Sequence, residues 1–320
     1  MNMRTVPILF TFDDKLVLPA CVCMTSLLNS AEPDTFYDIF IIHCEKYDLK
    51  HTDVARIPEY FTNCRMTFRP ISNEFIGAYE VRGIPETCYY RMLSPELIPE
   101  YDKILYSDVD VIFRDDLSKY YEVDLGSNCF GGVDNCSSLR PGVQRYVKDV
   151  LGLDPANGFF CSGNLLINLK QIREEGVCDR FRELAKNNYR QQDMDIINIA
   201  CNGRFHRFPP AFCLAINIYR MIVLKREEML TLFSNEELDY ALEKGIVHFN
   251  GAKPWNGWSH HFDVWWEAYR KCPFFNEEHY LEFYDSREDE LDRFSLKKRV
   301  KLLVRYFVFG QKREASSLDF

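Results

Sequence analysis

Two aspartates, Asp108 and Asp110, occupy the stretch of this chain that is best suited to chemistry. They follow a short apolar run at 103–106 and precede another at 111–113, so they lie where the sequence otherwise favours burial. Charged side chains are seldom buried unless they are paired or bind a metal. Alternate residues of an extended segment point the same way, so both carboxylates can face one Mg2+ or Mn2+ ion. Phosphate oxygens of a ligand often complete the coordination shell of such an ion. The pair predicts a metal–diphosphate site at a strand end; the alternative is a surface turn with two solvated acids.

A later stretch supplies a histidine and a lysine that could join this site. A short strand carries His248 into a turn that contains Gly251, and Lys253 follows. Neutral histidine is a frequent metal ligand, and lysine is a point-charge donor to phosphate. Together they would add a third metal ligand and a clamp for a diphosphate. The alternative is a histidine bonded to backbone at a strand end and a solvated lysine.

Two further motifs contain small or acidic residues. Ser162 and Gly163 interrupt the apolar run 159–169, and a glycine there lets a ligand or backbone approach closely. Asp193 and Asp195 form a second Asp-x-Asp, at the start of an expected helix. Acids in a first helical turn are favoured by the helix dipole, so helix capping is the alternative to a role in chemistry.

The segments around these residues predict an α/β fold. Strands are expected at 6–12, 37–44, 64–70 and 103–106, and helices at 19–29 and 49–61. This alternation is typical of a layer of parallel strands, in which ligands bind beyond the carboxyl ends. The acidic pairs Asp13/Asp14 and Asp108/Asp110 both follow such ends, so two separate stretches indicate one crevice. Further expected elements are a helix opening at Tyr89, a strand at 129–133, and helices at 143–151, 171–187 and from Gln192.

Composition and charge exclude several classes of protein. The chain has 320 residues, 47% of them hydrophobic and 15% aromatic, which is ample for a core. No apolar window is long enough for a transmembrane helix, and the first residues lack a signal-peptide pattern. Twelve cysteines are scattered through apolar segments without a Cys-x2-Cys pair, which favours free thiols in a reducing, cytoplasmic setting. The net charge of −9 argues against a nucleic-acid partner.

The C-terminal tail differs in charge from the rest. Residues 295–320 hold seven Lys or Arg and two Asp or Glu, a net +5, so the remainder carries −14. At helical spacing, Leu296, Val300, Leu303 and Phe307 lie opposite Lys297, Lys298, Lys301 and Arg305. A basic amphipathic helix predicts binding to an anionic membrane surface through residues 295–313, peripherally on the inner face. The alternative is a helix docked on the body of the protein.

The motifs taken together resemble the retaining glycosyltransferases of family 8, which include bacterial lipopolysaccharide galactosyl- and glucosyltransferases. The resemblance covers about residues 6–258 and keeps the family's order. The matching motifs are Phe12-Asp13-Asp14, Tyr89-x-Arg91-Met92, the run 101–110 that ends in Asp108-Val109-Asp110, Ser162-Gly163-Asn164, Asp193-x-Asp195 and His248-x-x-Gly251-x-Lys253-Pro254-Trp255.

This resemblance implies a GT-A (Rossmann-like) domain with a mixed central sheet at 1–262. A helical extension at 263–320 would end in the basic amphipathic tail. It also implies a UDP-sugar donor, a Mn2+ ion with Mg2+ as its alternative, and a glycan or lipid-linked acceptor.

The resemblance also implies roles for individual residues. Asp108, Asp110 and His248 would bind the metal. Asp13 would read the uracil edge and Val109 would lie against the ribose, with Phe10 and Thr11 also in the nucleotide-sugar site. Gly251 and Lys253 would hold the diphosphate, and Ser162, Gly163 and Asp193 would lie near the transferred sugar. The implied catalytic residues are Asp193, Lys253 and Arg91.

Three departures from the family pattern affect the expected chemistry. Cys161 stands where Asn is frequent, Lys15 where the galactosyl branch tends to have Asn, and Met194 where Gln is common. Methionine cannot act as a nucleophile, so attack from the same face as the leaving group is favoured over a double displacement, with Asp193 as the remaining nucleophile candidate. The competing hypotheses are a non-catalytic nucleotide-sugar-binding protein and a metal-dependent phosphohydrolase, although two-metal hydrolases usually need more carboxylates.

Overall fold

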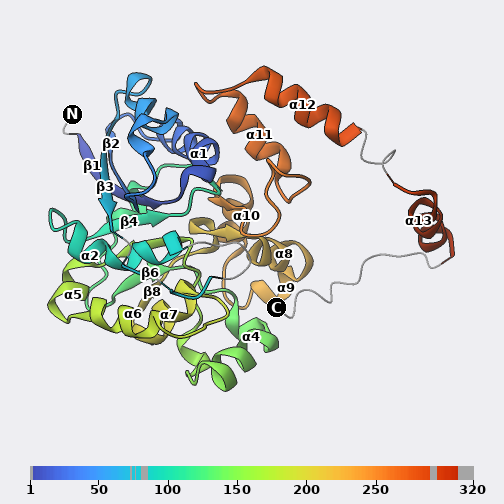
Figure 1. Ribbon diagram of the computed structural model, residues 1–320. Helices are drawn as coiled ribbons and strands as arrows, with labels where there is room; N and C mark the ends of the chain where they lie inside the picture. The colour runs from blue at the N-terminus through green and yellow to red at the C-terminus, as the bar shows by residue number, and fades with distance from the viewer. Residues whose placement is uncertain (1–2, 73, 76, 81–85, 289–293, 309–320) are drawn as a thin grey trace.

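A seven-stranded mixed sheet forms the centre of the protein (Figure 1). The computed structural model describes residues 3–72, 74–75, 77–80, 86–288 and 294–308. The strands, in their order across the sheet, are β3 (Cys64–Ile71), β2 (Thr35–Cys44), β1 (Arg4–Thr11), β4 (Ile104–Ser107), β7 (Asn164–Ile167), β6 (Phe130–Gly132) and β8 (Phe205–Arg207). The first four run parallel, with Ile8 of β1 opposite both Ile39 and Leu105, whereas β7 runs antiparallel to β4 and β6. The predicted α/β class with a mixed central sheet is confirmed.

The central strands form because their sequences are apolar on both faces. In β1, Ile8 and Phe10 belong to one buried cluster, while Leu9 between them belongs to a second cluster on the other face. Such double burial is usual for parallel strands that are covered by helices on both sides. The sheet is therefore a rigid platform whose strand ends can hold side chains in place.

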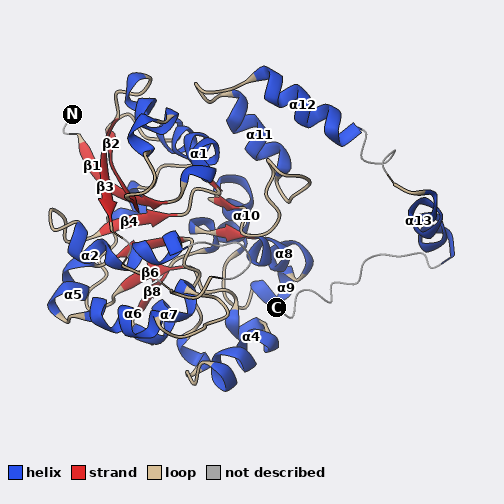
Figure 2. Cartoon of the chain, in the orientation of Figure 1, coloured by secondary structure: helices blue, strands red, loops and turns tan. Residues whose placement is uncertain are grey.

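Helices cover both faces of the sheet, as Figure 2 shows. In chain order they are α1 (Val17–Asn29), α2 (Ser94–Leu97), α3 (Ser118–Tyr121), α4 (Pro141–Arg145), α5 (Leu169–Glu174), α6 (Val177–Ala185), α7 (Asp193–Ala200), α8 (Ile216–Leu224), α9 (Arg226–Met229), α10 (Asn235–Lys244), α11 (Phe262–Arg270), α12 (Glu277–Glu288) and α13 (Leu296–Val308). The predicted helical C-terminal region is present, and α13 includes most of the predicted basic helix.

A second, small sheet joins distant parts of the chain beside the ends of the main strands. Its order is β5 (Val111–Ile112), β10 (Val247–His248) and β9 (Leu214–Ala215). β10 pairs antiparallel with β5, which sets His248 opposite Val111, and it pairs parallel with β9. This pairing fixes the position of His248 relative to Asp110, the residue that precedes Val111.

Three helix predictions were wrong in detail. The helix expected at 49–61 is a pair of 3-10 turns, Leu49–His51 and Asp53–Glu59, because Pro58 lies inside the segment and cannot donate a backbone hydrogen bond. The single helix expected at 171–187 is split into α5 and α6 at Gly176, whose φ of 65° ends one helix and starts the next. The helix opening at Tyr89 lies in a 3-10 segment, Glu86–Leu93.

The remaining predictions about the whole chain concern cysteines, membrane spans and domains. All twelve cysteines are free and buried, as predicted. Among the described helices, none has the length and apolar character that crossing a bilayer requires. α11 buries Trp265 and Tyr269 in the same cluster as β1, so it packs on the domain that it follows, and the division at residue 262 stays a prediction.

Candidate active site

A cleft of about 620 Å3 opens at the carboxyl ends of β1 and β4. Its lining includes many of the residues singled out from the sequence, namely Thr11, Arg91, Asp108, Val109, Asp110, Ser162, Gly163, Asp193, His248 and Lys253. The predicted crevice beyond the strand ends is therefore present, and it brings together side chains from six separate stretches of the chain.

Asp108, Asp110 and His248 converge at one point in this cleft. The His248 Nε2 atom lies 3.3 Å from Asp110 Oδ1 and 3.5 Å from Asp108 Oδ2. One ligand atom from each residue lies within 4.8 Å of the other two. Two carboxylates and one imidazole suit a divalent cation such as Mn2+ or Mg2+, which takes oxygen ligands readily. The residues present therefore fit the ion that the sequence motifs imply.

The far side of the His248 ring is held by a thiol and a glycine. The Cys213 Sγ atom lies 3.6 Å from His248 Nδ1, so Nε2 is the nitrogen that faces the carboxylates. Gly163 lies against the same ring: a Cβ atom added there would be 2.2 Å from His248 Cε1 and 3.0 Å from Asp108 Oδ2. The glycine predicted from the Ser-Gly motif thus leaves the room that the ring and the carboxylate occupy.

Replacing Gly163 with Ala is expected to weaken Mn2+ binding about tenfold or more, because the new methyl group must displace His248 or Asp108. Isothermal titration of the protein with MnCl2 measures this. The matched control is Gly257→Ala, where the nearest atom to an added Cβ is Arg287 Nη1 at 3.4 Å. Equal Mn2+ affinity in the two variants would contradict the steric argument.

Arg91 ties the metal-site carboxylate to the opposite wall of the cleft. This buried guanidinium donates to Asp108 Oδ1 at 2.8 Å and to the Ser162 carbonyl at 2.6 Å, and it lies 3.3 Å from Asp193 Oδ2. It also stacks over the Tyr106 ring at 4.1 Å, and the Tyr106 hydroxyl donates to Asp108 Oδ1 at 2.6 Å. The network orients Asp108 and leaves its other oxygen toward His248.

The two acids of the second Asp-x-Asp have different surroundings. Asp195 accepts hydrogen bonds from the Tyr146 hydroxyl at 2.6 Å and from the Gln191 amide at 2.8 Å, which is a structural role. Asp193 lines the cleft; burial raises its pKa, against the opposing effect of Arg91. The residue before it, Gln192, has a φ of 50°, and strained backbone of this kind is concentrated at functional sites.

Lys253 reaches the metal-site carboxylates from the loop after β10. Its ammonium group pairs with Asp110 and donates to the Phe249 carbonyl at 2.7 Å. Burial disfavours ionised Asp110, but His248 and Lys253 outweigh burial and hold the pKa of Asp110 well below its usual range. Burial likewise disfavours charged His248, but Asp110 and Asp108 outweigh it and raise the pKa of His248.

Mn2+ affinity is expected to rise as the pH increases toward the raised pKa of His248, by at most about tenfold per unit, because the ion must displace one proton from His248. The sign follows from the raised pKa: at lower pH the charged imidazole pairs with the carboxylates, and this pairing is lost as pH rises through that pKa. Titrations with MnCl2 at several pH values measure the slope. The control variant His51→Ala, which removes an exposed histidine paired with Asp48, should show the same slope. A Mn2+ affinity that does not change with pH in the unaltered chain would contradict the role of His248 as a metal ligand.

Only some of the residues expected to hold the nucleotide line the cleft. Thr11 and Val109 line the cleft, and the Thr11 hydroxyl lies 3.2 Å from that of Tyr106. Asp13 is buried at the end of β1 and caps the following turn by accepting from the Lys15 amide at 3.1 Å. The Phe10 side chain is fully buried in the core, so only its backbone is left for binding. The nucleotide roles of these residues stay predictions.

The Gly251 assignment also stays a prediction. Gly251 is not among the residues that line the cleft, and an added Cβ there would meet only Ile216, at 3.9 Å. The residue itself is exposed, in the loop that leads from β10 to Lys253.

Sequence reasoning missed several polar residues of the cleft. Asn135, Arg140, Arg190 and Asn217 line it, and buried Arg140 donates to Asn135 Oδ1 at 2.7 Å. They are isolated in the sequence, so no motif marked them. Met194 lies against a small apolar cluster that includes Val143 and Phe159, which accounts for an apolar residue at this position.

Comparison with solved structures shows that this sheet order is that of the GT-A fold. The galactosyltransferase LgtC, solved in complex with donor and acceptor sugar analogues, superposes with a TM-score of 0.67, at 24% sequence identity, over 85% of this chain and 98% of LgtC. The bifunctional glycosyltransferase WbbM superposes with the same TM-score, at 20% identity, over 88% of this chain and 51% of WbbM.

The chain belongs to glycosyl transferase family 8, whose sequence profile matches residues 7–259. Similar curated proteins include General stress protein A of Bacillus subtilis, 24% identical over 199 residues, and glycosyltransferase GlyB of Streptococcus pneumoniae, 22% identical over 240 residues. These matches cover 59% and 70% of this chain. They span only 66% and 54% of the two relatives. The resemblance to family 8 that the sequence motifs indicated is confirmed by this match.

Proposed function

We propose that this chain is a retaining glycosyltransferase that moves a hexose, glucose or galactose, from a UDP-sugar to a glycan or lipid-linked acceptor. Mn2+ is the proposed ion, with Mg2+ as its alternative. The observation that carries the proposal is the convergence of Asp108, Asp110 and His248 in a cleft that Lys253 also lines. A product in lipopolysaccharide or another cell-surface glycan, and a cytoplasmic location, belong to the same proposal.

Each charged residue of the cleft has a separate role in the proposed mechanism. When bound, the ion would supply Lewis-acid stabilisation to the donor diphosphate. Lys253, which pairs with Asp110 in this structure, would donate to the departing diphosphate and offset its growing charge. Arg91 holds Asp108 and Asp193 on opposite sides of one guanidinium and so keeps their spacing fixed.

Asp193 would face the sugar that is transferred. As the bond to phosphate breaks, the anomeric carbon becomes cation-like, and a nearby carboxylate stabilises it electrostatically. Met194 offers no nucleophile beside it. We therefore favour attack by the acceptor from the same face, with the leaving phosphate taking the acceptor proton. Double displacement through Asp193 is the alternative.

A panel of UDP-glucose, UDP-galactose and UDP-N-acetylglucosamine with Mn2+ tests the proposed function. Release of UDP with free or transferred hexose from one of the first two, lost when EDTA is added, is the expected result. Tight binding without turnover would leave only the nucleotide-sugar-binding role. Release of inorganic phosphate or sugar phosphate instead would indicate a phosphohydrolase.

We also propose that the tail helix α13 binds an anionic membrane surface. Its apolar side chains are exposed, Leu296 by 78% and Phe307 by 85%, while Lys297, Lys298 and Lys301 are exposed as well. The Arg305 side chain and residues 309–313, also part of the predicted surface, lie outside what the structure describes. Figure 1 shows α13 apart from the sheet and its helices.

Deleting residues 295–320 is expected to lower binding to vesicles of phosphatidylglycerol and phosphatidylcholine by at least about 100-fold, because roughly 1 kcal/mol is lost for each basic residue near the surface and the tail holds seven. Vesicle sedimentation measures the difference. Pure phosphatidylcholine vesicles are the control, on which both forms should bind weakly. Equal partitioning of the two forms on the anionic vesicles would dismiss the idea.

A further inference from the structure

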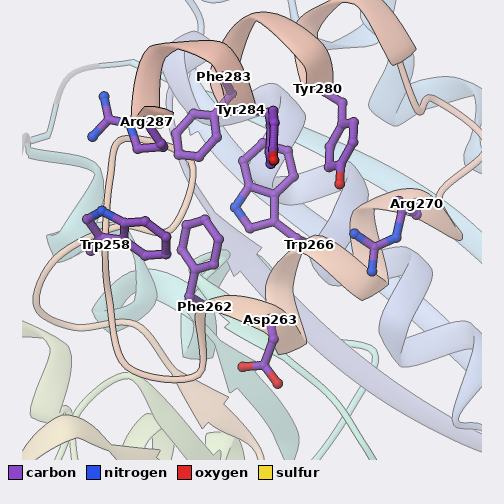
Figure 3. A pocket seen from close by; sticks show the side chains of 9 residues that line it. All are labelled: Trp258, Phe262, Asp263, Trp266, Arg270, Tyr280, Phe283, Tyr284 and Arg287. Carbon is purple, nitrogen blue, oxygen red and sulfur yellow. The ribbon is translucent and has the colours of Figure 1, made fainter. Parts of the chain in front are cut away.

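A second cavity, of about 430 Å3, lies between α11 and α12 and shares none of its lining with the cleft described above (Figure 3). Aromatic side chains make up most of its wall: Trp258, Phe262, Trp266, Tyr280, Phe283 and Tyr284. We call this cavity the aromatic pocket. Nothing in the proposed transfer reaction uses it.

The floor of the aromatic pocket is well packed, and its mouth is open. Buried Trp266 lies 4.5 Å from the Phe283 ring and 5.5 Å from the Tyr280 ring, measured between centroids. Its indole N–H donates to the Pro254 carbonyl at 3.2 Å, so the floor is attached to the loop that carries Lys253. At the mouth, Trp258 is 62% exposed and Tyr284 is 52% exposed. The pocket is therefore a preformed apolar hollow that solvent can enter.

Charged groups stand at the edges of this hollow. The Arg270 guanidinium lies over the Tyr280 ring at 5.8 Å, and that of Arg287 lies over the Phe283 ring at 5.2 Å. Asp263 is the acid that also lines the pocket. Figure 3 shows the two arginines on opposite sides of the aromatic rings. Guanidinium groups so placed can bind a phosphate or carboxylate whose attached chain enters between the rings.

We propose that the aromatic pocket binds the hydrocarbon chain of an anionic membrane amphiphile, whose acidic headgroup pairs with Arg270 or with Arg287 at one end of the rings. A hydrocarbon chain loses no hydrogen bonds when it enters a wall of aromatic carbon. A sugar would bury hydroxyl groups against side chains that offer few partners, which is costly.

The position of the aromatic pocket supports this ligand. α12, which forms one wall, is followed in the chain by α13, whose basic and apolar side chains are exposed. Tryptophan, tyrosine and arginine at an opening are also the composition that membrane–water interfaces favour. The proposal goes beyond sugar transfer and does not require it.

Tryptophan quenching tests the proposal on the full chain. Two of the four tryptophans, Trp258 and Trp266, line the pocket. Monomeric 12-bromododecanoate, kept below its micelle concentration, would bring bromine into contact with their rings. The expected result is saturable quenching by one ligand per chain, reversed by unbrominated dodecanoate. The Tyr284→Ala variant and the R270Q/R287Q double variant should each weaken binding about tenfold.

Matched controls separate the pocket from other surfaces and from instability. Tyr60→Ala removes another aromatic side chain, 49% exposed, and should leave quenching unchanged. Deleting residues 295–320 should also leave it unchanged, since the probe is monomeric and needs no membrane. Circular dichroism melts establish that the variants are folded. Failure of UDP-sugar turnover would leave this result untouched, so the two proposals fail separately.

Several outcomes would overturn the proposal. Linear, unsaturable quenching, or quenching unaffected by Tyr284→Ala, would mean that the pocket is not the site. Equal affinity for uncharged bromododecanol would remove the role of the two arginines. Much stronger quenching after deletion of 295–320 would show that α13 itself fills the pocket, and displacement of the probe by an uncharged oligosaccharide would indicate a glycan subsite.

Discussion

The Asp110→Asn variant should lose about 10³-fold or more in kcat/KM for UDP-sugar turnover while its fold stays intact. Asp110 is the acid that both His248 and Lys253 contact, and its pKa is held low by that pair. An amide keeps the size of the side chain but removes the negative charge that an ion and the two cationic groups share. The loss should therefore appear in Mn2+ affinity as well as in turnover.

The matched control for this variant is Asp179→Asn, an isosteric change at a carboxylate whose side chain is 88% exposed. It should change neither Mn2+ affinity nor turnover. Thermal melts of both variants without metal distinguish a lost ligand from a lost fold. Undiminished turnover by folded Asp110→Asn would end the argument for a metal site at this position.

The Lys253→Ala variant should lose roughly 10²- to 10³-fold in kcat, because one preorganised positive charge at the leaving diphosphate is removed. Its effect should differ from that of Asp110→Asn. Lys253 pairs with Asp110 in this structure, so removing the lysine leaves the Asp110 carboxylate available to an ion. Mn2+ affinity should therefore change by less than about tenfold. Turnover kinetics and MnCl2 titration together give this contrast.

Two comparison variants sharpen the Lys253 experiment. Lys253→Arg keeps the charge and should recover part of kcat, whereas Lys225→Ala, on the surface beside Glu228, should behave as the unaltered chain. Parallel losses of kcat and of Mn2+ affinity in Lys253→Ala would mean that the lysine supports the metal site rather than the leaving group.

The central sheet could be predicted because its strands are long and apolar on both faces. β1 and β2 carry that signal over eight and ten residues. Helices were harder to predict where a single residue, such as Pro58 or Gly176, changes the type of helix or ends it. Proline and glycine are known helix breakers, but their presence alone does not fix whether a segment ends, turns or changes helix type.

The metal-binding residues of the candidate site could be predicted from the sequence, but the contacts that position them could be predicted only in part. The carboxylate pair and His248 stand out by type and spacing, whereas the contact between them depends on β5 and β10, strands of only two residues each. Cys213 behind the imidazole and Arg140 in the cleft come from segments without any motif. Such contacts arise from tertiary packing between segments far apart in the chain, which short sequence windows do not record.

The small sheet of β5, β10 and β9 has a consequence for the protein during its synthesis. Its strands come from residues 111–112, 214–215 and 247–248, so Asp108 and Asp110 are synthesised long before the strand that carries His248. A nascent polypeptide would lack this cluster until the strand that carries His248 had left the ribosome and inserted between β5 and β9. The cluster of Asp108, Asp110 and His248 can thus be completed only late in translation.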